Sequence, residues 1–185
     1  MPLIALQVQA ELTNLASLRA PPTYPWHLTI KCTSCGETTP SSKPVVISSD
    51  SIVEGIRGGD VTARLKCKLC GRINTVLLLP GEHVYGVRGG GDAADGDDDA
   101  VAGEVVEGGV GAAPRRPGWS TFASFDCRGV ELVAWVVADD VPFEAVAGGG
   151  GAPVEGGALI DDGEWYGYDE GVAVTEWEYR FVKVK

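Results

Sequence analysis

Four of the five cysteines in this chain stand in two pairs of identical spacing, and this feature constrains the fold more than any other. Cys32 and Cys35 form the first pair, Cys67 and Cys70 form the second, and a glycine directly follows each pair. Two intervening residues let the chain turn so that both sulfur atoms point at one ion, about 2.3 Å from each. A glycine after the turn accepts a positive φ, which brings backbone N–H groups toward the sulfurs. The pattern therefore predicts two metal-binding knuckles.

Two such knuckles supply four thiolates, which close a tetrahedral shell and leave no open position. Soft thiolates in this arrangement favour Zn²⁺, with iron as the less favoured occupant. We predict that one structural zinc ion is held by Cys32, Cys35, Cys67 and Cys70. A catalytic zinc keeps a vacant or water-filled position and usually has histidine or carboxylate ligands. We therefore expect no Lewis-acid chemistry at this site.

Other interpretations of the cysteine pairs stay open at this point. A thiol oxidoreductase would use a redox-active pair, although the βαβ context of thioredoxin-like motifs is not visible here. A metal-handling protein would exchange zinc or copper with a partner. The nearby cations either neutralise the thiolates or contact the phosphates of a nucleic acid; they are Lys31, Lys66, Lys68 and Arg72. A net charge of −11 repels a polyanion, so we favour neutralisation.

Glycine and charge divide the chain into parts. Eleven of the 26 glycines lie in residues 81–118 and six in residues 148–157. Residues 1–80 carry 8 Lys and Arg against 5 Asp and Glu, whereas residues 119–185 carry 4 against 13. We predict a zinc-binding β half over 1–80 and a second β half over 119–185. The acidic range 81–118 would be a flexible insert, and 148–157 a short glycine-rich loop within the second half.

Apolar and polar residues alternate with period two in much of the chain, which predicts β-strands. No stretch shows a sustained helical period with caps. We therefore expect an all-β fold, built as two similar antiparallel, sandwich-like halves. The predicted strands cover residues 6–12, 26–32, 44–47, 75–79, 122–127, 130–137 and 176–181.

A weak internal similarity concerns the same two halves. Residues 10–15 resemble residues 125–130, and the apolar positions of residues 26–30 resemble those of residues 177–181. A duplicated β half on each side of the acidic insert would explain both similarities. Chance likeness between amphipathic strands would also explain them.

The other chemistry-bearing residues have plainer explanations. We expect Cys127 to be a buried thiol rather than a nucleophile, and we expect His27 and His83 to face solvent. The acidic residues in 161–164 and 168–170 could bind a hard cation, but a solvated acidic face is the favoured interpretation. No serine or cysteine stands with histidine and aspartate at a recognisable motif spacing, so we expect no catalytic residues and no enzyme.

The cysteine pairs and several segments beyond them resemble a known family, the eukaryotic CXXC-motif-containing zinc-binding proteins. The matching positions are residues 4–7, Trp26, 31–37, Asp50, Ser51, 66–70, 125–131, Trp165, 168–170 and 181–183. The resemblance implies a small, soluble, mainly β protein of two similar halves. It also implies one zinc ion on the four paired cysteines and no established enzymatic activity. This chain departs from the family pattern in its two glycine-rich stretches, which are longer and more acidic here.

Expectations about location and partners follow from what the sequence lacks. No window approaches 18 consecutive apolar residues, so we expect no membrane-spanning helix. The first residues lack the features of a signal peptide, so we expect a protein of the cytoplasm, with the nucleus as a second location. We also expect the protein to be a monomer. With no catalytic motif, the favoured function is a protein-interaction adaptor. Its interface would use strand edges and aromatic residues, among them Trp119, Trp135 and Trp165.

Overall fold

A computed structural model gives the fold of the chain. It describes residues 2–56, 58–86, 118–148, 153–155, 157–158, 160, 162–167 and 171–184. Every regular element in these ranges is a strand, so they include no helix that could cross a membrane. Most of the predicted insert over 81–118, and much of the predicted loop over 148–157, lies outside the described residues.

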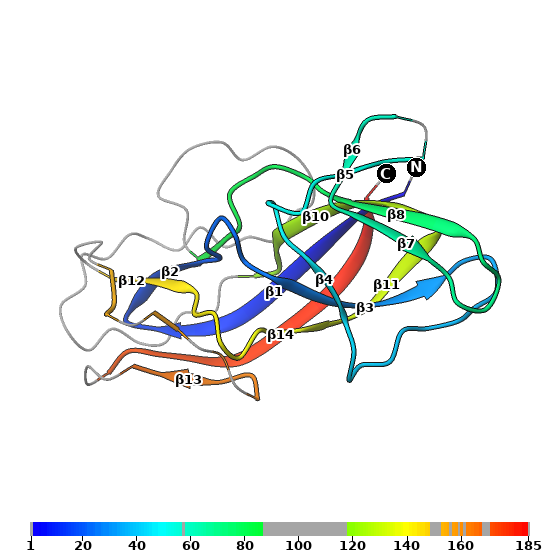
Figure 1. The fold of residues 1–185 in the computed structure, drawn as a ribbon. Coiled ribbons are helices and arrows are strands. Elements are labelled where there is room, and N and C mark those ends of the chain that lie inside the picture. Colours follow the sequence, from blue (N-terminus) through cyan, green and yellow to red (C-terminus); the bar gives the residue numbers. More distant parts are fainter. Residues whose placement is uncertain are drawn as a thin grey trace.

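The strands of the described residues follow one another along the chain as shown in Figure 1. They are β1 (Leu3–Thr13), β2 (Leu15–Arg19), β3 (Trp26–Cys32), β4 (Val45–Ile47), β5 (Val53–Glu54), β6 (Asp60–Val61), β7 (Ala63–Lys66), β8 (Ile73–Leu78), β9 (Val84–Gly86), β10 (Ser120–Arg128), β11 (Val130–Val136), β12 (Glu144–Ala147), β13 (Trp165–Tyr166) and β14 (Ala173–Val184). Each of the seven predicted strand regions overlaps one of these strands.

The strands form four antiparallel sheets. The largest has the order β13-β14-β1-β10-β8-β7, and two smaller sheets have the orders β11-β3-β4 and β12-β2-β9. The fourth is the short β5-β6 pair. In Figure 1, β1 and β14 cross the middle of the molecule side by side, and the two chain ends lie together. The predicted all-β antiparallel fold is confirmed.

Strands from the two halves of the sequence share sheets. β1 lies between β14 and β10 in the largest sheet, and β3 pairs with β11. The predicted boundaries at 80 and 119 are therefore boundaries in the sequence only, because strands from both sides of them pair within the same sheets.

The two halves also repeat the same arrangement. A single residue with positive φ separates β1 from β2 and β10 from β11, namely Asn14 (52°) and Gly129 (80°). The carbonyl oxygen of Gly129 accepts a 3.0 Å hydrogen bond from the N–H of Thr33, just after β3. The carbonyl oxygen of Asn14 accepts a 2.9 Å bond from Gly148, just after β12, in the same way. These turns lie in the segments 10–15 and 125–130, which is the arrangement that a duplicated β half would produce.

The second sequence similarity has a different origin. Residues 26–30 lie in β3, whereas residues 177–181 lie in β14. The β7-β8 hairpin extends the largest sheet beyond β10 as the β13-β14 hairpin extends it beyond β1, so the counterpart of β14 is β8. β3 and β14 do not occupy equivalent positions in the fold, so their similarity is the chance likeness of two amphipathic strands.

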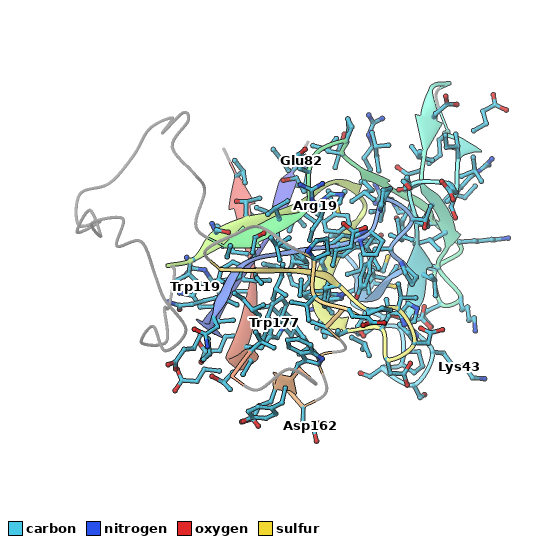
Figure 2. The ribbon with its side chains drawn as sticks, turned by 90° about the vertical axis from the view of Figure 1, so that its left-hand side faces the viewer. Arg19, Lys43, Glu82, Trp119, Asp162 and Trp177 are labelled. Carbon is cyan, nitrogen blue, oxygen red and sulfur yellow. The ribbon has the colours of Figure 1, made fainter. Side chains whose placement is uncertain are left out.

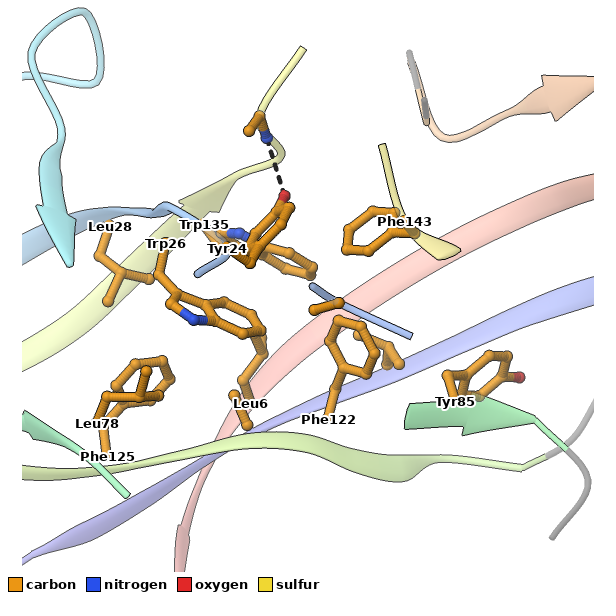
Figure 3. Close-up of a cluster of buried hydrophobic side chains, with 14 of the residues drawn as sticks. Leu6, Tyr24, Trp26, Leu28, Leu78, Tyr85, Phe122, Phe125, Trp135 and Phe143 are labelled. Atoms are coloured by element: carbon orange, nitrogen blue, oxygen red, sulfur yellow. Dashed lines mark hydrogen bonds between the residues drawn. The ribbon is translucent and has the colours of Figure 1, made fainter. Parts of the chain in front are cut away.

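A cluster of aromatic side chains forms the core between the sheets (Figure 3). The ring of Trp26 lies edge-on to that of Phe122, with centroids 5.8 Å apart, and 5.6 Å from that of Trp135. The hydroxyl of Tyr24 accepts a 3.0 Å hydrogen bond from the N–H of Ala138. Burial raises the pKa of Tyr24 to about 12, so this hydroxyl stays protonated.

The sequence-based expectation for Trp135 is wrong in one respect. Trp135 is only 3% exposed and belongs to the core, so it cannot lie at a partner interface. A β-bulge between Leu132 and Ala134 shifts the register of β11 against β3. The bulge moves the alternation by one position, which turns Trp135 inward and leaves Val133 at the surface.

Candidate metal centre

The first knuckle begins where β3 ends. The N–H of Cys32 donates to the carbonyl oxygen of Glu37 at 2.8 Å, and the N–H of Gly36 donates to the carbonyl oxygen of Cys32 at 2.9 Å. Gly36 has a φ of +80°, which an L-residue with a side chain rarely adopts. The chain therefore reverses tightly within the knuckle, and Cys35 returns toward Cys32.

The second knuckle repeats these contacts in the turn between β7 and β8. The N–H of Cys67 donates to the carbonyl oxygen of Arg72 at 2.8 Å, and the N–H of Gly71 donates to the carbonyl oxygen of Cys67 at 3.0 Å. Gly71 has a φ of +71°. The same spacing and the same following glycine thus produce the same local structure twice.

The two knuckles bring their four sulfur atoms together. All four lie within 4.8 Å of one another, with Sγ–Sγ distances of 3.5 Å for Cys35 and Cys67 and 3.9 Å for Cys32 and Cys70. A tetrahedral zinc site with Zn–S bonds of about 2.3 Å has sulfur atoms about 3.8 Å apart. The four thiols therefore fit a zinc ion in number, chemistry and spacing. Both of these short approaches join different knuckles, which is not the pairing within one CxxC that a redox motif uses.

The local electrostatics differ between the four thiols. The backbone N–H groups of Ser34 and Cys35 point at the sulfur of Cys32 and lower the pKa of this thiol to about 6. The N–H of Cys70 acts in the same direction on Cys67, but the carboxylate of Glu37 and burial outweigh it and raise the pKa of Cys67 to about 12. Cys67 must give up the proton that it shares with Glu37 before it can act as a metal ligand.

Exposure of the site rises from one knuckle to the other. Cys32 is buried, Cys35 and Cys67 are half-buried, and Cys70 is exposed. The four neighbouring cations all have exposed side chains; they are Lys31, Lys66, Lys68 and Arg72. Their role in neutralising the thiolates stays a prediction.

Two residues contact the cysteines in ways that the cysteine pattern does not reveal. Oε2 of Glu37 lies 2.8 Å from the Sγ of Cys67 and 2.8 Å from the N of Leu69. These two contacts lower the pKa of the Glu37 carboxyl. The Nδ2 of Asn74, a residue that is 2% exposed, lies 3.8 Å from the Sγ of Cys32. Glu37 directly follows the first Cys-x-x-Cys-Gly motif, which is a usable signal, but nothing in the sequence links Asn74 to Cys32.

The predictions for the fifth cysteine and the histidines have different outcomes. Cys127 is completely buried, as predicted, and burial raises the pKa of its thiol to about 12. His27 is half-buried, so the prediction that it faces solvent holds only in part. The expectation that His83 faces solvent is wrong, because its Nδ1 lies 2.9 Å from the carbonyl oxygen of Phe122 and its ring packs edge-on against Trp26. Burial lowers the pKa of His83.

The acidic residues near the C-terminal end do not gather into a metal-binding group within the described residues. There the four cysteines form the one cluster of potential metal ligands. Asp162 and Glu164 are exposed, as expected of a solvated face. Asp161 and residues 168–170 lie outside the described ranges.

Comparisons with known proteins agree with this geometry. The model of the family described as CXXC motif containing zinc binding protein, eukaryotic, matches residues 5–182. The relative UPF0587 protein F46B6.12 from Caenorhabditis elegans is 27% identical over 191 residues, which cover 100% of this chain and 97% of the relative. The CXXC motif containing zinc binding protein of Homo sapiens is 28% identical over 191 residues, with 97% and 98% of the two chains covered.

Solved structures show the same fold. The structure titled Crystal Structure of C1orf123 superposes with a TM-score of 0.70 at 25% identity, over 98% of this chain and 99% of the other. A hypothetical protein from Plasmodium falciparum gives a TM-score of 0.71 at 18% identity, over 98% and 100% of the two chains. The family match spans nearly the whole sequence and includes both cysteine pairs. The chain therefore belongs to the family of eukaryotic CXXC motif containing zinc binding proteins.

Proposed function

We propose that this chain is a non-enzymatic protein in which one structural zinc ion supports a surface for protein–protein interaction. Cys32, Cys35, Cys67 and Cys70 would hold the ion, and the protein would act as an adaptor in the cytoplasm, with the nucleus as a second location. One observation carries the proposal: four thiols converge from two sheets, with all four sulfur atoms within 4.8 Å of one another.

The position of the knuckles supports a structural role for the metal. The first knuckle ends β3 in the β11-β3-β4 sheet, and the second joins β7 to β8 in the six-stranded sheet. An ion bound to all four thiolates is a cross-link between the two sheets. Since a closed all-cysteine shell offers no position for a water or a substrate, it favours stabilisation over Lewis-acid catalysis.

A chelator titration tests the structural role. Zinc content and far-UV circular dichroism would be followed together as a high-affinity chelator is added to the full chain. The proposal expects zinc to leave only as the strand signal is lost. Zinc loss with a fully preserved fold would contradict it.

A surface beside the second knuckle has the character of a protein interface. Leu69, at the tip of the knuckle, is 70% exposed between the exposed cations Lys68 and Arg72. Ile73 and Ile56 are 37% and 52% exposed, and both line a shallow pocket with Arg72. We call these five residues the knuckle face. The pocket carries charges of both signs, with Asp60 and Asp126 beside Arg72. Leu69 with its two flanking cations suits a partner segment in which acidic residues flank an apolar one.

The aromatic residues expected at an interface have other positions in this fold. Figure 2 shows Trp119 on the side of the molecule opposite Lys43, a residue of the segment between the first knuckle and β4. The guanidinium carbon of Arg180 lies 4.3 Å from the centre of the Trp119 ring, so Trp119 is engaged within the chain. Trp165 is half-buried and packs against the core cluster. The knuckle face is therefore the surface that the adaptor proposal uses.

A pair of variants tests the adaptor role. Leu69→Asp places a charge in the knuckle face, and Val133→Asp makes the same change at a 49% exposed position on β11. Quantitative cross-linking and affinity capture from the native cell should retain a partner with the wild type and with Val133→Asp, and lose it with Leu69→Asp. Equal zinc content of the three proteins is the control. The same partners on Leu69→Asp as on the wild type would contradict the proposed surface.

Metal handling is a second candidate, which the exposure of Cys70 favours. A ligand that reaches solvent can be approached by a thiol of a partner protein, so zinc or copper could pass between them. The chelator titration separates the candidates, because a transfer site releases metal while the strands persist.

Nucleic-acid binding stays the less favoured prediction. A fragment of residues 1–80 is not suitable for testing it, because β1 would lose both of its neighbours, β10 and β14. A mobility-shift assay on the full chain at several salt concentrations is the appropriate measurement. We expect no salt-dependent shift, since the net charge is −11.

A further inference from the structure

A carboxylate beside the first knuckle contacts the second knuckle. Glu37 directly follows Gly36, and its Oε2 accepts a 2.8 Å hydrogen bond from the backbone N–H of Leu69. The same oxygen lies 2.8 Å from the Sγ of Cys67. The Glu37 side chain is half-buried between the two knuckles. One side chain thus links the end of β3 to the turn between β7 and β8.

The bond to Leu69 differs from the other contacts between the knuckles. The Sγ–Sγ approaches and the contact of Asn74 with Cys32 all involve sulfur, which is a weak hydrogen-bonding atom. The Glu37–Leu69 bond joins a carboxylate to a backbone N–H, and charge-assisted bonds of this kind are the stronger class. When Cys67 is a metal-bound thiolate it no longer donates to Glu37, whereas the N–H of Leu69 still does. The backbone and the charge of the adjacent Lys68 also favour the Glu37 carboxylate, so the second knuckle keeps its contact with Glu37.

The position of Leu69 explains how this bond acts on the metal ligands. Leu69 stands between Cys67 and Cys70, so fixing its N–H fixes the turn that aims both sulfurs. The exposed ligand, Cys70, is the one that follows Leu69 directly. Residues that orient metal ligands without binding the metal typically change metal affinity by about 10–100-fold when they are removed.

We propose that Glu37 is a positioning residue that fastens the second knuckle to the first through the N–H of Leu69 and so slows the release of zinc. This inference rests on the zinc site of the proposed function, but it concerns a residue outside the four ligands. The hydrogen bond between Glu37 and Leu69, which joins the ends of two sheets, would then help to retain the metal.

Three substitutions of Glu37 test the bond. Glu37→Ala removes the acceptor, and Glu37→Asp keeps the charge but shortens the side chain by one methylene, so that it no longer reaches Leu69. Glu37→Gln keeps both the length and an oxygen acceptor. Glu54→Ala, at an exposed carboxylate on β5, is the matched control.

The measurement is the rate at which each full-length, zinc-loaded protein transfers zinc to an excess of a chromogenic chelator. We expect Glu37→Ala and Glu37→Asp to release zinc about 10–100-fold faster than the wild type, and Glu37→Gln and Glu54→Ala to stay close to it. Circular dichroism before chelator addition establishes that each protein is folded. If Glu37→Ala does not fold, Glu37→Asp and Glu37→Gln alone decide the question.

Two results would overturn the inference. One is a release rate for Glu37→Asp equal to that of the wild type, and the other is release from Glu37→Gln as fast as from Glu37→Asp. Either result leaves the zinc site itself intact. A wild-type protein that carries no zinc would instead contradict the proposed function, so the two failures are distinguishable.

Discussion

At the scale of single residues, the five cysteines fall into two groups that a serine scan separates. Serine at Cys32, Cys35, Cys67 or Cys70 removes a thiolate ligand, and structural zinc contributes on the order of 10 kcal/mol to folding. We expect each of these four variants to lose zinc and several kcal/mol of unfolding free energy, measured by urea denaturation. Cys127→Ser buries a hydroxyl in the core and should cost about 1–3 kcal/mol with zinc retained. Small, equal losses at all five positions would show that the ligand assignment is wrong.

Gly129 is a second residue with a sharp expectation, because a side chain there has no room. Its φ is +80°, and an added Cβ would collide with Oδ1 of Asn74, the residue whose amide nitrogen contacts Cys32. Gly58 has a similar φ of +74° with open space around it. Gly58→Ala should cost only the strain of a left-handed backbone, about 1–2 kcal/mol. Gly129→Ala should cost clearly more in thermal unfolding and also weaken zinc binding; equal losses for the two variants would contradict this packing.

His83 predicts a specific pH dependence of stability. Burial lowers its pKa in the folded protein, so below the ordinary value of about 6.5 the unfolded chain binds more protons than the folded one. This residue therefore contributes stability above about pH 6.5, and the contribution is lost as the pH falls toward the lowered folded-state pKa. His83→Gln should flatten the wild-type decline in thermal midpoint between about pH 6.5 and pH 5. Parallel curves for the two proteins would show that His83 does not titrate as described.

At the scale of elements, alternation in the sequence predicts the long strands and misses the short ones. β1 and β3 show a two-residue period along most of their length, which burial of one face requires. β10, β11 and β14 show it over only part of their length. β5, β6 and β13 have two residues each and carry no detectable period. Bulges are also invisible in the pattern, which is why strict alternation places Trp135 on the wrong face of β11. The knuckles were predictable because their spacing and glycines determine a local turn.

The segment between β9 and β10 gives a test at the same scale. Its central part, residues 89–113, lies outside the described residues. Because loop-closure entropy changes slowly with length, deleting residues 89–113 should leave the free energy of unfolding within about 1 kcal/mol of the wild type. Urea denaturation of the two proteins measures this. A large loss of stability would show that the segment contributes contacts to the fold.

At the scale of the whole molecule, the interleaved sheets make the two halves depend on each other. β1 takes its hydrogen-bonding neighbours, β14 and β10, from residues after 119. An isolated chain of residues 1–80 should therefore be unfolded by circular dichroism even with zinc present. A folded, zinc-binding fragment would contradict the shared-sheet architecture.

The order of the strands is the part of the fold that the sequence could not provide. Pairing β1 with β14 joins residues at opposite ends of the chain, and no local pattern encodes a partner at that distance. For the same reason, the contact of Asn74 with Cys32 across two sheets has no sequence signal. The four cysteines could be assigned to one site because zinc chemistry supplies the missing long-range constraint.

The most direct test of this account is native mass spectrometry of the freshly purified, reduced full-length protein beside its Cys32→Ser and Cys127→Ser variants. We predict one zinc ion per chain in the wild type and in Cys127→Ser, and loss of that ion in Cys32→Ser. A wild-type chain without metal, or a Cys32→Ser variant that holds zinc as firmly as the wild type, would contradict the claim that two knuckles from two sheets share one ion.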